Sequence, residues 1–366
     1  MLEQQQIQNR LITPMMLGPI TTPLTTVLNC QHPIMLAGMA QVSGGRLAAA
    51  VANAGGFSVV GGYECTPEQL RLAIHDMKQR FTRPDLPFGV AVAIPKCGAG
   101  ARKTNKDATR GRLDELIDIT VRSGARLFVS TAGVPPAYVV DRLHRAGLLV
   151  MNLVGHPKHA VKALDAGVDL VCAQGKEGRG HTGNIPTSVL VPAVVGVARR
   201  YRPPMLGGDS PALVVAGGGI ASGQGLAGAL MQGAAGAWVC TRFAASVEAD
   251  CPDAAKQAIV DCDFAGTQRT LVLTGRPLRM RPNGYINDWH SRRADEIQRL
   301  CSEGVVPMDR DRQAGRPVEI PVLMGEVAGL ITDILPARQI VEDMVREATE
   351  MLNLGCVYLG QRSSKL

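Results

Sequence analysis

A glycine-rich loop that contains one histidine is the part of this chain best suited to chemistry. Residues 174–183 read QGKEGRGHTG and follow an apolar strand predicted over residues 168–173. Glycines let backbone N–H groups approach a phosphate or a flat ring, and an imidazole with a pKa near neutrality can accept or return a proton. His181 is therefore the first catalytic candidate. The alternative is that His181 caps the helix that begins near Pro186, with the glycines serving only the turn.

Two further strand ends predict a phosphate site. The three glycines at residues 217–219 end one apolar run, and Thr241 and Arg242 end another. In barrels of alternating strands and helices, the loops after strands seven and eight form a common phosphate cradle from N–H groups, a hydroxyl and a helix N-terminus. We therefore expect a phosphorylated ligand. A dinucleotide fold is disfavoured, because neither a Walker loop nor G-x-G-x-x-G follows the first strand.

The elements that position these loops alternate between short apolar strands and amphipathic helices. This rhythm predicts an α/β fold, a (β/α)₈ TIM barrel, in preference to an open doubly wound sheet. The predicted strands are residues 33–36, 57–60, 88–94, 126–130, 148–153, 168–173, 213–216 and 237–240. The predicted helices include residues 45–54, one opened by residues 66–68, and residues 113–123, 136–145 and 159–166.

The pattern changes after strand eight. Residues 250–322 are more charged and lose the strand repeat, and a clear helix follows over residues 337–352. We expect a barrel over residues 14–249, a smaller, mostly helical cap subdomain over residues 250–336, and a helix within residues 337–360 that returns to the barrel wall. A small ligand would lie between barrel and cap. The long polar loop over residues 95–110 should lie at the catalytic face, where it could act as a lid.

Composition excludes several classes of function. The formal charge is +7, but the basic residues are scattered and aromatic residues make up 4% of the chain, which disfavours a nucleic-acid surface and favours attraction of small anions. No apolar run reaches transmembrane length, and the N-terminus lacks the order of a secretory signal. The nine cysteines form no C-x-x-C pair and do not alternate with histidine at metal-ligand spacing. We therefore expect a reduced intracellular protein with no metal site and no catalytic thiol, and Cys172 and Cys240 as buried thiols.

The last three residues match a targeting signal. Ser364, Lys365 and Leu366 form the tripeptide that a peroxisomal import receptor reads. We expect this receptor as a partner and import into a peroxisome or a related organelle such as the glycosome.

Several short motifs follow one another between Pro33 and about Met351. They are PIM (33–35), GGF (55–57), PFGV (87–90), ARKTN (101–105), the histidine loop (174–183), GGGI (217–220), TRF (241–243), TGRP (274–277) and ITDI (331–334). With these motifs in this order the chain resembles the nitronate monooxygenase family, formerly called 2-nitropropane dioxygenases, and especially its fungal-type members.

The resemblance implies an FMN cofactor and a set of residues that bind it. By position, Gln174 should contact the flavin, Gly218, Gly219 and Thr241 its phosphate, and His181 should be the catalytic base. The other implied cofactor contacts are Ala37, Gly38, Met39, Gly180, Val239 and Cys240.

Three positions depart from the family pattern. Arg179 stands where relatives have glycine, and it could close on an anionic substrate or obstruct the site. Cys240 replaces the usual glycine before Thr241, and Ala91 replaces a polar residue and removes one contact to flavin or substrate. These changes bear on substrate range more than on cofactor binding.

The resemblance implies that the enzyme oxidises alkyl nitronates, such as propionate 3-nitronate, or nitroalkanes, with O₂. His181 would remove a proton from a nitroalkane carbon or, when protonated, hold the nitronate. Basic groups that could steer the anion are Arg102, Lys103, Arg179, Arg276 and Arg279. Two alternatives are an FMN-dependent enoyl-thioester reductase that uses NAD(P)H and a catalytically silent flavin-binding protein. A homodimer is also compatible with the sequence.

Overall fold

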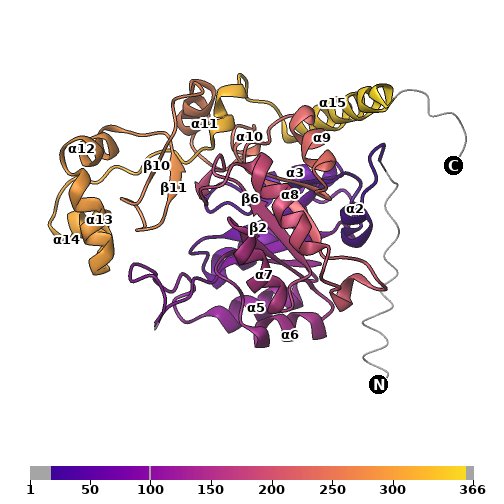
Figure 1. Cartoon of the computed structure of the whole chain (residues 1–366), viewed down its shortest axis with the longest axis horizontal. Helices are drawn as coiled ribbons and strands as arrows, with labels where there is room; N and C mark the ends of the chain where they lie inside the picture. The colour runs from indigo at the N-terminus through magenta and orange to yellow at the C-terminus, as the bar shows by residue number, and fades with distance from the viewer. Residues whose placement is uncertain (1–17, 99, 360–366) are drawn as a thin grey trace, which may run out of the picture.

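A closed barrel of eight parallel strands forms the centre of the molecule (Figure 1). The structure is a computed structural model, and it describes residues 18–98 and 100–359. The order around the barrel is β1-β2-β3-β4-β5-β6-β8-β9, and β9 closes the ring by pairing with β1, with Ile34 opposite Ala237. The strands are β1 (Ile34–Leu36), β2 (Phe57–Gly62), β3 (Phe88–Ala93), β4 (Leu127–Ala132), β5 (Leu149–Val154), β6 (Leu170–Gln174), β8 (Leu213–Gly217) and β9 (Gly236–Val239).

Each of the eight predicted strands is present within a few residues of its expected bounds, so the predicted barrel is confirmed. The strands are short and nearly continuous in apolar residues because helices cover their outer faces and side chains fill the interior. All six residues of β3 are buried.

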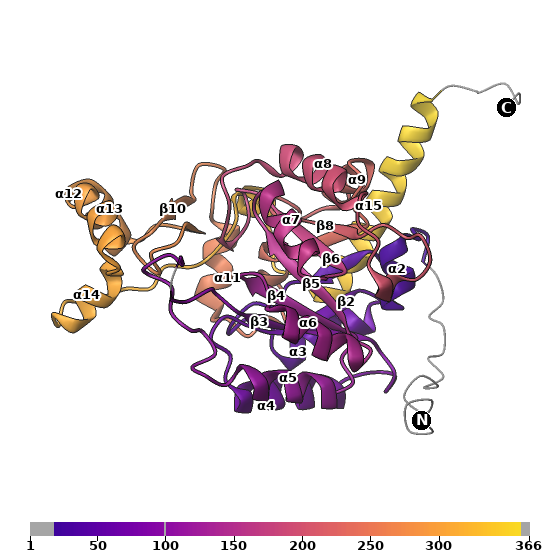
Figure 2. The ribbon, with the colours of Figure 1, turned by 60° about the horizontal axis from the view of Figure 1, so that its bottom comes forward.

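Helices surround the barrel between successive strands (Figures 1 and 2). The helix α4 begins as predicted, with Thr66 and Gln69 in a reciprocal capping box and Pro67 at its first position. The helices of this part are α2 (Pro23–Leu28), α3 (Gly45–Asn53), α4 (Pro67–Gln79), α5 (Leu113–Arg122), α6 (Ala137–Arg145), α7 (Pro157–Asp165), α8 (Thr187–Ala198), η1 (Pro204–Leu206), α9 (Gly223–Met231) and α10 (Thr241–Ala244).

The cap after β9 is mostly helical but also contributes strands that the sequence pattern did not predict. Two strands of the cap, β10 (Gln268–Thr270) and β11 (Leu278–Met280), form an antiparallel sheet with β7 (Gly180–His181) from the histidine loop. Strands of two or three residues are too short to show a period-2 pattern. The cap helices are α11 (Asp253–Val260), α12 (Gly284–Arg292), α13 (Ala294–Glu303), α14 (Pro307–Gln313) and η2 (Glu326–Leu330).

The cap has a hydrophobic core of its own. Trp289 is fully buried at its centre, among Val272, Met280 and Ile286. In Figures 1 and 2 the helices α12, α13 and α14 lie at one end of the molecule, opposite the end of α15 (Ala337–Tyr358).

The helix α15 is longer than the predicted helix over residues 337–352, and it packs on α9 and α3. The side chain of Glu347 accepts a hydrogen bond from the backbone N–H of Gly223, the first residue of α9, at 2.9 Å. Among the described helices, none combines the length and the hydropathy that crossing a membrane requires. The predicted targeting tripeptide (364–366) and residues 14–17 and 360 of the expected boundaries lie outside the described residues.

Candidate active site

A cavity of about 290 Å³, here called the barrel cavity, lies between the ends of the barrel strands and the cap. The carboxyl ends of the strands carry the active site in barrels of this architecture. The floor of the cavity is made by Ala37, Gly38, Met39, Ala40, Tyr63, Thr131, Ala132, Leu153, Gln174, Arg179, Gly180, His181, Trp238 and Cys240. Its roof is made by Leu273, Thr274, Leu278, Met308, Ile320 and Leu323 from the cap.

His181 lines this cavity and is held by the cap. The backbone of His181 pairs with Leu278 of β11, and its Nε2 lies 3.0 Å from Oγ1 of Thr274. The ring of Tyr63 lies 5.6 Å away, centroid to centroid. Desolvation, and to a lesser extent the positive charge of Arg276, lowers the pKa of His181 to about 4. The imidazole is therefore neutral at pH 7 and has a lone pair that can accept a proton.

The structure shows that the helix-cap alternative for His181 is wrong. The first N–H group of α8, from Thr187, donates instead to the carboxylate of Glu177, and the Thr187 hydroxyl donates to the same carboxylate at 2.8 Å. The cap of α8 is thus supplied from within the glycine-rich loop, and the His181 ring remains at the cavity.

Gln174 and Gly180 shape the loop around the histidine. The Nε2 amide of Gln174, at the end of β6, donates to the carbonyl of His181 at 2.7 Å. Gly180 has φ +74°, a conformation that side chains rarely adopt, and apart from its two chain neighbours no residue has an atom within 4 Å of the position that a Cβ would take. The loop thus leaves open space directly before His181, where a flat ring can approach the backbone.

The residues predicted to bind the phosphate lie beside this loop and do not line the barrel cavity. Gly218 and Gly219 follow β8 with φ +91° and +74°, and a Cβ on Gly218 would lie 3.1 Å from the N atom of Gly178. Within the described chain, the N–H groups of Gly218 and Gly219 donate to no protein acceptor. A compact backbone with unused N–H groups is a fitting site for a phosphate.

The second half of the predicted phosphate site is partly occupied by the cap. Oγ1 of Thr241 accepts a hydrogen bond from the N–H of Gly325 at 3.0 Å, so its hydroxyl proton is the part left for a ligand. The buried Val239 uses its carbonyl to accept from the N–H of Ala37 at 3.0 Å, so it supports the loop after β1. Cys240 does line the barrel cavity.

The loop after β1 packs closely on the neighbouring strands. A Cβ on Gly38 would lie 2.6 Å from the Cβ of Ala91, so a side chain at residue 38 requires a shift of β3. Ala91 is fully buried and is not among the residues that line the barrel cavity. With an alanine at this position, residue 91 makes no contact in the barrel cavity. The small Ala91 instead gives room to the loop that reaches the cavity.

The five basic residues predicted to steer anions have different environments. Arg179 lines the barrel cavity, and its Nε donates to the carbonyl of Leu323 at 2.9 Å, so it ties the roof of the cavity to its floor. Arg276 acts on His181 electrostatically. Arg102 and Lys103 are exposed on the loop after β3.

Arg279 is the fifth of these basic residues, and its guanidinium holds the cap to the barrel. It pairs with Glu326 at 2.7 Å and donates to the carbonyl of Lys176 and the hydroxyl of Thr267, both at 2.9 Å. Arg279 is therefore a link between cap and barrel and not a free anion-steering group.

Thiol and metal chemistry have no support in this site. Burial raises the pKa of Cys240 to about 11 and the pKa of Cys172 well above its ordinary value, so both thiols are protonated at neutral pH. Among the described residues, no group of histidine, cysteine and acidic side chains is arranged to hold a metal ion.

The sequence predicted a ligand between barrel and cap but not which cap residues line the site. Thr274, Met308 and Leu323 line the barrel cavity, but they belong to a segment with no recognisable strand pattern. Thr274 is within the TGRP motif, and this motif was the available signal. Tyr63 directly follows β2, and its place at the carboxyl end of a barrel strand could have identified it.

Comparison with known proteins agrees with this geometry. The sequence matches the family model described as nitronate monooxygenase over residues 21–347. One relative, the (3aS,4S,5R,7aS)-5-hydroxy-7a-methyl-1-oxo-octahydro-1H-indene-4-carboxyl-CoA dehydrogenase of Mycobacterium tuberculosis, is 29% identical over 90% of this chain and 96% of its own length.

Two solved structures are similar over nearly their whole length. FabK from Thermotoga maritima has a TM-score of 0.74 and 28% identity, covering 93% of this chain and 99% of its own. Nitroalkane oxidase from Streptomyces ansochromogenes has a TM-score of 0.73 and 26% identity, covering 91% of this chain and 99% of its own. The family match spans most of the sequence and the barrel is shared, so the chain belongs to the nitronate monooxygenase family and is a flavin-dependent oxidoreductase.

Proposed function

We propose that the protein binds FMN and oxidises alkyl nitronates, such as propionate 3-nitronate, with O₂. The observation that carries this proposal is the charge of the barrel cavity. A neutral histidine and the arginine Arg179 line it, and no aspartate or glutamate is among its described lining residues. Such a cavity favours a small anion over a cation.

The residues present fit a flavin mononucleotide. Gln174, Gly180 and the loop of Ala37 to Met39 would hold the ring, where the positive φ of Gly180 leaves open space. Gly218 and Gly219, with unused N–H groups, and the hydroxyl of Thr241 would hold the phosphate. When bound, FMN supplies the electron acceptor that the side chains lack.

The environment of His181 favours a nitronate over a neutral nitroalkane. An imidazole with a pKa of about 4 is a weak base, so it is poorly suited to removing a proton from carbon. A nitronate has already lost that proton. Its negative charge beside the ring would raise the pKa of His181, because an opposite charge favours the protonated form. We therefore propose that His181 takes up a proton when the nitronate binds, and that the protonated ring then holds the nitronate in the cavity.

The variant His181→Asn tests this role. It keeps a polar side chain but cannot take up the proton that pairs with the anion, so kcat/KM for a nitronate should fall by about tenfold or more, the scale of one lost charge-assisted hydrogen bond, and turnover of a neutral nitroalkane should fall less. The visible spectrum should show that flavin stays bound. Equal, small losses with both substrates would contradict the assignment.

An FMN-dependent enoyl-thioester reductase is the second candidate. The similarity to FabK, and to a relative whose name includes a CoA thioester, favours it. This enzyme would need NAD(P)H as its reductant, which separates the two functions experimentally. From the sequence motifs we also propose that the chain is a fungal-type member of the family and that it is imported into a peroxisome or glycosome.

A further inference from the structure

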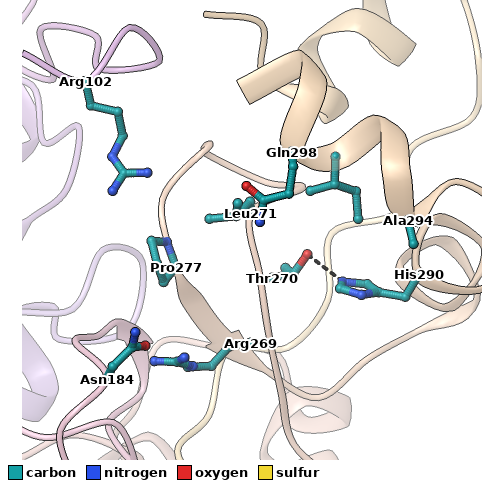
Figure 3. A pocket seen from close by; sticks show the side chains of 10 residues that line it. Arg102, Asn184, Arg269, Thr270, Leu271, Pro277, His290, Ala294 and Gln298 are labelled. Carbon is teal, nitrogen blue, oxygen red and sulfur yellow. Dashed lines mark hydrogen bonds between the residues drawn. The ribbon is translucent and has the colours of Figure 1, made fainter. Parts of the chain in front are cut away.

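A second pocket of about 470 Å³, here called the cap pocket, lies outside the barrel cavity (Figure 3). Arg102 and Asn184 come from loops of the barrel and face the cap across this space. The remaining lining residues belong to the cap. They are Arg269, Thr270, Leu271, Pro277, His290, Ala294, Ile297 and Gln298.

The cap pocket carries uncompensated positive charge. Arg102 donates one N–H group to the carbonyl of Gly275 at 3.2 Å, and Arg269 donates one to the carbonyl of Gly183. A guanidinium has five N–H groups, so both arginines retain donors for a ligand. No aspartate or glutamate lines the pocket, and in the described part of the chain neither arginine has a carboxylate within ion-pairing distance.

The effect of this charge extends to the neighbouring arginines. Desolvation and then the charge of Arg102 lower the pKa of Arg276. Arg269 acts in the same direction on the pKa of Arg279, after desolvation and against the opposing effect of Glu326. Two arginines without a carboxylate partner around one hollow that no acidic residue lines indicate a site for an anion.

The rest of the lining adds an apolar and a hydrogen-bonding surface. Leu271, Pro277 and Ile297 offer apolar contact, and the amides of Asn184 and Gln298 offer donors and acceptors. His290 is already bonded to Thr270, with Nε2 at 2.9 Å from Oγ1. The lining therefore suits a ligand with both a multiply charged anionic part and a partly apolar part that can form hydrogen bonds.

We propose that the cap pocket binds the nucleoside diphosphate part of an organic cofactor or substrate, with the diphosphate on Arg102 and Arg269. Coenzyme A thioesters and nicotinamide dinucleotides both contain an adenosine diphosphate. Either ligand would place its adenosine diphosphate in the cap pocket, and comparing the binding of coenzyme A with that of NADPH distinguishes the two. This site is additional to the flavin and nitronate site, which lies in the barrel cavity.

The segment between β10 and β11 connects the two cavities. Leu271 and Pro277 line the cap pocket, and Leu273, Thr274 and Leu278 line the barrel cavity. Thr274 also contacts Nε2 of His181. A ligand in the cap pocket therefore packs on the segment that positions the catalytic candidate.

Equilibrium titration of the flavin-loaded protein with ADP tests the proposal, followed by inorganic pyrophosphate, adenosine, coenzyme A and NADPH. ADP should bind to the wild type, and adenosine should bind more weakly because it lacks the charge. Each of Arg102→Gln and Arg269→Gln should weaken ADP binding by about tenfold or more, the scale of one lost charge-assisted hydrogen bond. Arg102 is exposed, so its variant should fold even where the Arg269 variant does not.

The control removes two positive charges elsewhere, one more than each test variant. The double variant Arg199→Gln, Arg200→Gln changes two exposed arginines after α8, and it should bind ADP as the wild type does. Tighter binding of coenzyme A than of NADPH would identify a coenzyme A thioester as the ligand of the cap pocket. The reverse order would identify a nicotinamide dinucleotide. The proposal is overturned if the wild type binds no ADP at millimolar concentration, or if Arg102→Gln and Arg269→Gln bind ADP unchanged. Binding is measured without turnover, so failure of nitronate oxidation would not affect this result.

Discussion

Replacement of His181 by asparagine should change how the stability of the protein depends on pH. In the folded protein the pKa of His181 is about 4, and in the unfolded chain it is close to its ordinary value of 6.5. Between these values the unfolded chain binds more protons than the folded protein. Stability therefore falls as the pH falls through this window, and no further loss from this group occurs below pH 4.

The magnitude follows from the two pKa values. The pKa of about 4 in the folded protein predicts a loss of about 2 kcal/mol between pH 8 and pH 5, and about 3 kcal/mol when the pH falls below 4. The His181→Asn variant lacks this titration. The difference in unfolding free energy between wild type and variant should therefore change by about 2 kcal/mol from pH 8 to pH 5.

Urea unfolding of the flavin-free proteins at a series of pH values measures this difference. His75→Asn, on the exposed face of α4, is the control for the substitution itself. A constant difference between wild type and His181→Asn across pH 5 to 8 would refute the account, because it would mean that the imidazole titrates equally in both states.

Two further predictions concern the cap and the C-terminus. Asp311 is buried and accepts hydrogen bonds from Tyr285, Trp289, Arg293 and Arg316, so Asp311→Ala should destabilise the cap by about 3–5 kcal/mol in urea unfolding. The exposed Glu303→Ala, which removes an ion pair with Arg299, should cost less than about 1 kcal/mol, and equal effects would contradict the assignment of Asp311 as the central link of the cap. A fluorescent protein fused to the N-terminus should give a punctate organelle signal that disperses when residues 364–366 are deleted, and unchanged localisation after deletion would show that the tripeptide is accidental.

The barrel could be predicted from the sequence because each strand is a short apolar run and each is followed by a loop and an amphipathic helix. The position of His181 could be predicted for the same reason, since the end of β6 is visible as the boundary between apolar and glycine-rich residues. These features are local, and local hydrophobic periodicity reveals them.

The contacts that complete the site are not local. Thr274 reaches His181 from 93 residues away, through an antiparallel pairing of strands that are only two or three residues long. The pKa of His181 depends on this enclosure and on Arg276, so its direction could not be read from the loop. The capping role of Glu177 was likewise hidden, because it acts on Thr187 across the turn.

The visible spectrum of the purified protein during anaerobic titration tests the central claim most directly. The account predicts flavin absorbance that a nitronate bleaches without oxygen, and that NADH leaves largely unchanged over the same time. Rapid bleaching by NADH with none by a nitronate would contradict the proposed oxidation and favour the thioester reductase. A protein that contains no flavin and takes up no FMN would contradict both.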